Sequence, residues 1–206
     1  MKRIRLFLLL SVFSGLLSQV LPAMGSQSLL RVTFRNDTGV TIRFLFAAAA
    51  DTRLWGPDLL GARDMTYGQI ESFFVHFPDR EACFDFLALD TRGDAYLIQA
   101  FRLREDQDGI IRLGRSHYIG PYPSMKICRL YVTNASTRII SYLFMPPEDS
   151  VSWGFDILDD ASSLGPGESR VFSIPVGPKL QRYEILALSR DQALVQRQIG
   201  LQDTKP

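Results

Sequence analysis

The chain contains an internal repeat. When the sequence is shifted by 98 residues, the segment 29–36 lies over 127–134, since 127 − 29 = 98. The same shift places Trp-Gly-Pro-Asp-Leu-Leu at 55–60 over Trp-Gly-Phe-Asp-Ile-Leu at 153–158. Self-similarity at a fixed period is the sequence signature of a duplicated structural unit. We therefore expect two copies of one domain, in which the residues kept by both copies are needed to build it.

The first 25 residues have the pattern of a secretion signal. A basic segment at 2–5 precedes an apolar run at 6–17, and small residues follow at Ala23 and Gly25. We expect cleavage after Gly25, which would leave a periplasmic or secreted chain with no transmembrane segment. An uncleaved membrane anchor is the alternative, but a span needs about 20 apolar residues and serines interrupt this run.

Charge argues against nucleic acid as a partner. Three of the 23 Lys and Arg lie in the expected signal, so 23 − 3 = 20 remain against 22 Asp and Glu. Proteins that bind nucleic acid usually carry a basic patch, and no basic run interleaved with aromatic residues is present here.

Apolar residues alternate with polar ones, a period of two that predicts strands. We expect strands at 30–35, 40–46, 70–77, 83–90, 95–104 and 110–113 in the first copy, and at 127–133, 138–144, 169–175, 182–188 and 192–200 in the second.

Many short strands with regular turns, and no amphipathic helix of useful length, predict an all-β protein. We expect two tandem small antiparallel β-sandwich-like domains at 26–113 and 127–206, joined by a linker at 114–126 that is rich in Gly and Pro.

The shared Trp-Gly-x-Asp segments contain the strongest candidate site residues. Trp55 and Trp153 are the only tryptophans, and Asp58 and Asp156 follow them at the same spacing. An indole beside a carboxylate suits a ligand such as a sugar, a cation or a peptide end. Alternatively the Trp covers an open edge of the sandwich, and the Asp accepts hydrogen bonds from nearby amides. Duplication in two domains with different surfaces favours this structural clamp, which we expect to form a single helical turn.

Two asparagines occupy one turn position. Asn36 and Asn134 both begin Asn-x-Thr/Ser patterns that could accept a glycan. Asn also stabilises tight turns by bonding its own backbone, and that interpretation explains both copies.

Cys83 and Cys128 are the only cysteines, and export would expose them to oxidising conditions. A disulfide between them would tie the two domains together. Cys128 however replaces Leu30 at an expected core position, which favours a small buried side chain instead.

Enzyme chemistry has little support in the sequence. The two histidines, His76 and His117, have no counterpart in the other copy, and no phosphate loop, zinc motif or nucleophile elbow is present. A carbohydrate-active or other hydrolase that uses Asp58 or Asp156 with a second carboxylate is the alternative. Acidic residues at 148–160 could attract calcium, but their spacing fits no EF-hand. We therefore predict no metal site and no cofactor.

These motifs resemble those of a family of small exported bacterial β-domains with no established activity. The resemblance rests on the turn at 36–39, the segments 55–60 and 153–158, the Pro-Gly turn at 166–167 and Cys83-Phe84-Asp85-Phe86. It implies export and duplication, and no mechanism. The family often carries a second cysteine where this chain has Phe101-Arg102-Leu103, so its disulfide does not carry over.

The sequence thus predicts a non-catalytic binding or scaffolding protein of the bacterial envelope. Its partner would be an envelope protein or a glycan, held at the interdomain face or at the two Trp-containing loops. A structural surface component that self-assembles through edge strands is a further alternative.

Overall fold

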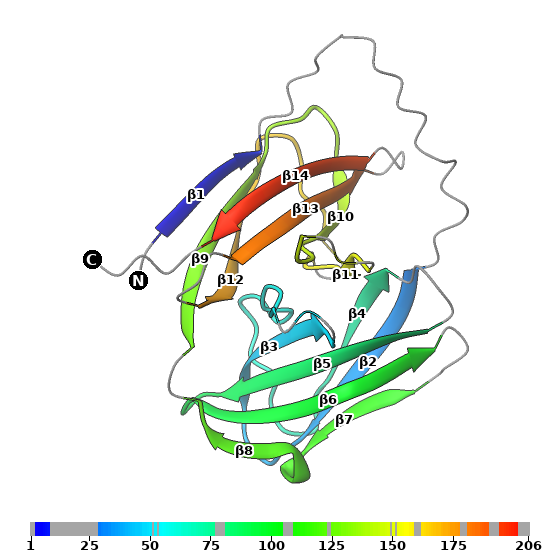
Figure 1. Cartoon of the computed structure of the whole chain (residues 1–206), viewed down its shortest axis with the longest axis vertical. Helices are drawn as coiled ribbons and strands as arrows, with labels where there is room; N and C mark the ends of the chain where they lie inside the picture. Colours follow the sequence, from blue (N-terminus) through cyan, green and yellow to red (C-terminus); the bar gives the residue numbers. More distant parts are fainter. Residues whose placement is uncertain are drawn as a thin grey trace.

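The computed structural model describes residues 3–8, 29–50, 52, 54–76, 81–104, 109–122, 125–148, 150, 152–158, 162–177, 181–189 and 194–201. These residues form several mostly antiparallel sheets, so the all-β prediction is confirmed. We refer to residues 29–121 as the N-terminal half and to residues 126–201 as the C-terminal half (Figure 1). None of the described residues forms a helix long and apolar enough to cross a membrane.

Two four-stranded sheets make up the N-terminal half. The first has the order β11-β4-β2-β7, from β2 (Leu29–Asp37), β4 (Ile70–His76), β7 (Ile110–Gly114) and the short β11 (Gly154–Phe155). The second has the order β3-β5-β6-β8, from β3 (Ile42–Ala49), β5 (Glu81–Asp90), β6 (Asp94–Arg104) and β8 (Tyr118–Pro121). A 3₁₀ turn, η1 (Arg115–His117), leads into β8. One strand of the first sheet, β11, therefore belongs to the C-terminal half.

Two three-stranded sheets make up the C-terminal half. One has the order β1-β9-β12, from β1 (Arg3–Leu8), β9 (Lys126–Asn134) and β12 (Ser169–Val176). The other has the order β10-β13-β14, from β10 (Ile140–Phe144), β13 (Gln181–Ser189) and β14 (Leu194–Leu201). Most neighbouring strands are antiparallel, but β1 runs parallel to β9 and β7 runs parallel to β2. β1 belongs to the expected secretion signal, whose cleavage stays a prediction.

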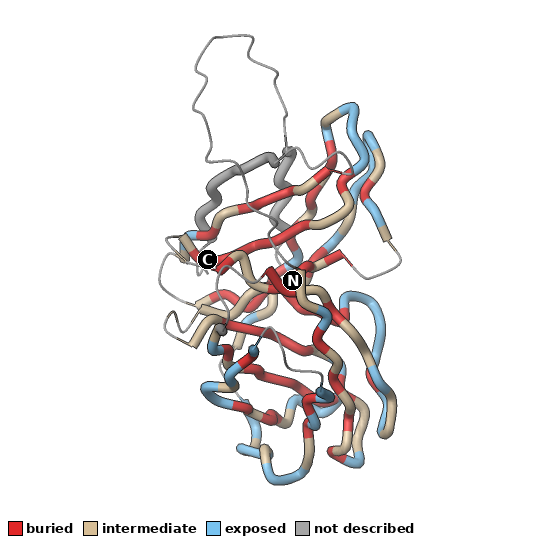
Figure 2. The backbone as a smooth tube through the Cα atoms, turned by 90° about the vertical axis from the view of Figure 1, so that its right-hand side faces the viewer, coloured by how far each residue is buried: buried red, intermediate tan, exposed pale blue. Residues whose placement is uncertain are grey.

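Each half has an apolar core between its two sheets, because alternate residues of a strand point to the same face. In the N-terminal half, Phe34 of β2 packs edge-on against Phe73 of the neighbouring strand and Phe86 of the opposite sheet, with ring centroids 5.9 and 4.8 Å away. In the C-terminal half, Leu130 of β9 and Tyr183 of β13 are fully buried in a second core. Buried segments run through both halves and across the region between them (Figure 2).

The predicted strands all correspond to observed ones, and two other expectations require comment. Part of the predicted linker forms β8, which pairs with β6 through Asp94 and Pro121. The helical turn predicted for the Trp-Gly-x-Asp segments is wrong, because Gly154 and Phe155 form the short strand β11 along β4, and residues 55–60 form no helical turn either. The backbone bonds of Gly154 and Phe155 run to another strand instead of along the chain, which is why no helical turn forms there.

Candidate functional site

Two buried aspartates shape the loops that carry the Trp-Gly-x-Asp segments. Oδ1 of Asp58 accepts hydrogen bonds from the amides of Leu45 at 2.9 Å and Leu60 at 3.1 Å. Asp156 repeats this arrangement, since its Oδ1 accepts from the amides of Leu143 at 2.8 Å and Leu158 at 3.1 Å. The two aspartates are only 1% and 3% exposed. Each carboxylate therefore fastens its loop to the second strand of its own half, as the clamp interpretation predicts.

The backbone of each aspartate bonds to the opposite half. The Asp58 amide donates to the carbonyl oxygen of Ser173 on β12 at 2.8 Å, and the Asp156 amide donates to the carbonyl oxygen of Phe74 on β4 at 2.8 Å. The two loops thus hold the halves together reciprocally, each one against a strand of the other half.

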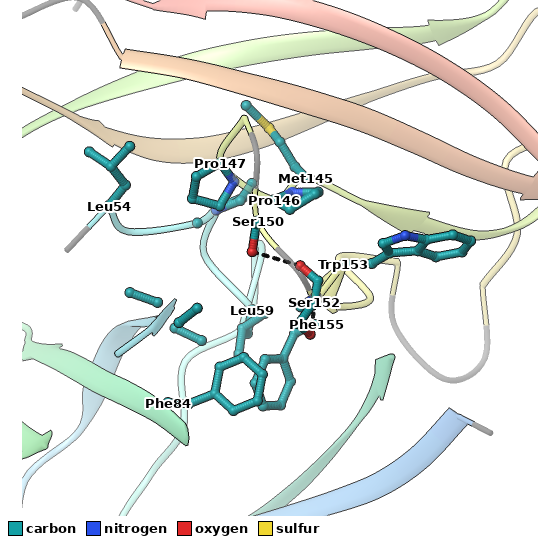
Figure 3. A pocket seen from close by; sticks show the side chains of 16 residues that line it. Leu54, Leu59, Phe84, Met145, Pro146, Pro147, Ser150, Ser152, Trp153 and Phe155 are labelled. Carbon is teal, nitrogen blue, oxygen red and sulfur yellow. Dashed lines mark hydrogen bonds between the residues drawn. The ribbon is translucent and has the colours of Figure 1, made fainter. Parts of the chain in front are cut away.

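The loop of the C-terminal half also enters the core of the N-terminal half. β11 pairs with β4 in antiparallel register, with Gly154 opposite His76 and Phe155 opposite Val75. The ring of Phe155 lies edge-on to Phe84, with centroids 5.2 Å apart, and belongs to the N-terminal core. Phe84 and Phe155 lie side by side in the lining of the pocket shown in Figure 3.

Trp153 stacks on a histidine of the other half. Its indole lies nearly parallel to the His76 imidazole, with centroids 4.2 Å apart and an angle of 15° between the rings. The Trp153 amide donates to Nδ1 of His76 at 3.3 Å, which requires that nitrogen to be unprotonated. Burial lowers the pKa of His76 to about 4, so the imidazole is neutral at neutral pH.

Trp55 also lies where the two halves meet. It packs on a third apolar cluster that includes Phe46 and Leu87 of the N-terminal half and Ile127 of β9. Its carbonyl oxygen accepts a hydrogen bond from the Tyr183 hydroxyl of the C-terminal half at 3.1 Å. Both tryptophans are therefore part of the interface between the halves, and the assignment of Trp55, Asp58, Trp153 and Asp156 to ligand binding stays a prediction.

The carboxyl group of Asp58 has a strongly raised pKa. Burial raises its pKa to about 7, and the hydrogen bonds from the Leu45 and Leu60 amides only partly oppose this effect. Its second oxygen, Oδ2, is buried without a hydrogen-bond partner among the described residues. An ionised carboxylate is costly in such surroundings, which is the physical cause of the raised pKa of Asp58.

Between the halves, one pocket is narrow and apolar. Its volume is about 30 Å³, and its lining includes Leu54, Pro147, Ser152 and Phe155 (Figure 3). A space of this size holds about one water molecule. We therefore interpret it as a gap in the packing of the interface.

A second opening between the halves is much larger, with a volume of about 540 Å³. We call it the interhalf groove; it is lined by Arg43, Phe44, Gly61, Ala62, Asp64, Ile127, Arg129, Val171 and Ser173. Arg43 forms an ion pair with Asp64 at 3.5 Å, and both side chains are partly exposed. Arg129 lies on the exposed side of β9, and Val171 is 42% exposed. The groove therefore combines positive charge with apolar surface in a space large enough for several side chains.

The turn asparagines have a structural role. Asn36 is fully buried, and its Nδ2 donates to the carbonyl oxygens of Val40 and Met65 while its Oδ1 accepts from Thr38. Asn134 makes the corresponding bonds, with Nδ2 donating to the carbonyl oxygens of Arg138 and Leu164. Both amide hydrogens of each Asn are used, which confirms the turn interpretation.

Cys83 is exposed and Cys128 is buried in the C-terminal core, and the possible disulfide between them does not form in this structure. No cluster of three or more metal-ligating side chains occurs in the described part of the chain. The acidic residues Asp149, Asp159 and Asp160 lie outside the described residues.

The groove residues were missed by the sequence analysis. Arg43 stands over Ser141 at the shift of 98, and Arg129 stands over Arg31 within the repeated segment, so the repeat does not single out the pair. Their proximity arises from the way the two halves pack, for which the sequence carries no signal. Comparison of the chain with models of protein families, with curated proteins and with solved structures finds no match.

Proposed function

We propose that this protein is an exported, non-catalytic binding or scaffolding module of the bacterial envelope, made of two tandem β-sandwich-like domains. The repeat of the Asp58 hydrogen bonds around Asp156 supports the duplication. The secretion pattern of residues 1–25 and the resemblance to small exported β-domains support the location.

The observation that carries the binding function is the interhalf groove. The Trp-containing loops face the interface between the halves, whereas the groove is open and has Arg43, Arg129 and Asp64 around apolar surface. An acidic protein segment with apolar side chains complements this surface best, because its carboxylates would pair with the guanidinium groups while its apolar groups cover Phe44 and Val171. An acidic glycan would satisfy the charges but leave more of the apolar surface uncovered.

The burial of the loop carboxylates supports a binding role over hydrolysis. Asp58 and Asp156 are almost fully buried and are bonded to backbone amides. A glycosidase needs two carboxyl groups that flank a bond of the substrate in an open cleft. These two aspartates would require the interface to open before a substrate could reach them.

Capture of a partner from an envelope extract tests the proposal. The double variant R43Q/R129Q removes both groove cations, and R182Q removes an exposed arginine that does not line the groove. We expect the exported protein and R182Q to capture one partner, and the double variant to lose at least about tenfold in affinity. Capture that is unchanged in the double variant would refute the groove as the binding surface.

A further inference from the structure

β1 lies beside β9 in the same way that β7 lies beside β2, and β9 and β2 are corresponding strands of the two halves. β7 runs parallel to β2 and places Ile111 opposite Phe34 and Leu113 opposite Asn36. β1 runs parallel to β9 and places Leu6 opposite Val132 and Leu8 opposite Asn134. Val132 and Asn134 are the residues that the shift of 98 aligns with Phe34 and Asn36. The two parallel strands therefore have the same register.

This position closes the edge of a core. Ile111 and Leu113 of β7 are 4% and 2% exposed, and they complete the N-terminal core beside β2. In the C-terminal half, Leu130 and Val132 of β9 belong to the core at the corresponding place. β1 is the one strand that lies on this edge of β9 in the described part of the chain.

Removal of residues 1–25 would take β1 away from β9. The edge would then present unpaired backbone groups beside the apolar residues of the C-terminal core. An exposed edge of this kind is a template for pairing with a strand from another chain. In such pairing the main-chain hydrogen bonds provide affinity, and the pockets that receive alternate side chains provide specificity.

We propose that the edge of β9 in the exported protein accepts, in parallel, an extended segment of a partner envelope protein that takes the position of β1. This inference rests on the proposed function, because it assumes export with loss of the N-terminal segment. It adds a second contact surface, the edge of β9, and specifies that the partner contributes an extended segment.

The register defines the chemistry of the incoming segment. Residues opposite Leu130, Val132 and Asn134 must be apolar, as Ile4, Leu6 and Leu8 are in β1. The alternate residues lie opposite Arg129, Tyr131 and Thr133, which are exposed or half-buried, so polar side chains are acceptable there. Arg129 also lines the interhalf groove, so the edge and the groove share this residue.

Hydrogen exchange measured on the full chain and on the exported, processed chain tests the inference. We expect the amides of Arg129, Tyr131 and Thr133, which alternate with the Asn134 amide that donates to Glu168 on the β12 side, to exchange at least about tenfold faster in the processed protein, while β2 stays protected by β7. A synthetic peptide with the sequence of residues 2–9 should slow the exchange of these amides by a factor of 1 + [peptide]/Kd, about 100-fold at a peptide concentration of 100 times Kd.

Two substituted peptides provide matched controls. The peptide carrying I4S, L6S and L8S should not protect β9, whereas the peptide carrying R3S, R5S and F7S should protect it like the parent. A partner captured from the envelope should be displaced by the parent peptide only. Equal effects of the two substituted peptides would refute register-specific pairing.

Other occupants give different results. Protection of the amides of Arg129, Tyr131 and Thr133 in the isolated processed protein would overturn the proposal. A monomeric mass would then indicate a strand of the same chain, and a dimeric mass would indicate a second copy. If the parent peptide fails to bind while R43Q still weakens capture, the strand inference is wrong and the proposed function stands. If the peptide protects β9 while R43Q and R129Q leave capture unchanged, the groove is refuted as the binding surface and the strand inference stands.

Discussion

The amide of Asp58 donates a hydrogen bond to the carbonyl oxygen of Ser173 in the opposite half of the molecule, at 2.8 Å. The amide of Asp156 makes the reciprocal bond to Phe74, also at 2.8 Å. Because the side chains of both aspartates fix the shape of their own loops, loop shape and interface stability depend on the same two residues. A ligand that required either carboxylate would have to compete with both sets of bonds.

Replacing Asp156 by alanine is expected to destabilise the protein strongly. The substitution leaves the buried amides of Leu143 and Leu158 without an acceptor, and each such loss costs about 1–3 kcal/mol. We expect the free energy of unfolding in urea to fall by about 2–4 kcal/mol. Asp64→Ala, which removes a partly exposed ion pair with Arg43, is the control and should cost below about 1 kcal/mol. Equal losses in the two variants would contradict a structural role for Asp156.

The strands, and the hydrogen bonds that the side chains of Asp58 and Asp156 accept from nearby amides, could be predicted from the sequence for physical reasons. Alternation of apolar and polar residues reports directly on a sheet with one face buried, so strands such as the one predicted at 110–113 were found almost to the residue. The sequence repeat drew attention to Asp58 and Asp156, whose side chains make corresponding hydrogen bonds. The pairing of Gly154 and Phe155 was not predictable, since it depends on β4 in the opposite half. The groove was not predictable for the same reason.

The buried turn asparagine provides a second test. Asn134→Asp removes the two N–H donors that bind the carbonyl oxygens of Arg138 and Leu164, and brings a carboxylate toward these oxygens. We expect a loss of about 2–4 kcal/mol in the free energy of unfolding at pH 7. Ser136→Ala, which removes one hydroxyl from the same turn, should cost about 1 kcal/mol. A loss for Asn134→Asp no larger than that of the control would contradict the network.

Two buried groups should act on the pH dependence of stability in opposite directions. The pKa of Asp58 is raised from 3.8 to about 7, so the folded state binds more protons than the unfolded state between these values and stability falls as pH rises. The pKa of His76 is lowered from 6.5 to about 4, so the unfolded state binds more protons and stability rises with pH. Each contribution has a slope of about 1.4 kcal/mol per pH unit.

Because the two windows overlap between about pH 4 and 6.5, these slopes nearly cancel in the unaltered protein. Asp58→Asn should expose the contribution of His76, giving stability that rises with pH in this range. His76→Asn keeps an acceptor for the Trp153 amide and should expose the contribution of Asp58, giving stability that falls up to about pH 7. Urea unfolding at half-unit pH steps measures both slopes. Parallel curves for all three proteins would contradict this assignment.

Phe155 tests whether the two halves are energetically interlocked. It belongs to the C-terminal half, yet its ring packs against Phe84 and Phe86 in the N-terminal core at 5.2 and 5.7 Å between centroids. Phe155→Ala opens a cavity there and should cost about 3–5 kcal/mol, whereas Phe155→Leu should cost below about 1.5 kcal/mol, because it fills most of the space. Hydrogen exchange locates the effect: the β5 amides of the N-terminal half should exchange faster in Phe155→Ala. Faster exchange confined to the C-terminal half would show that the halves fold independently, because a substitution in one would then leave the core of the other intact.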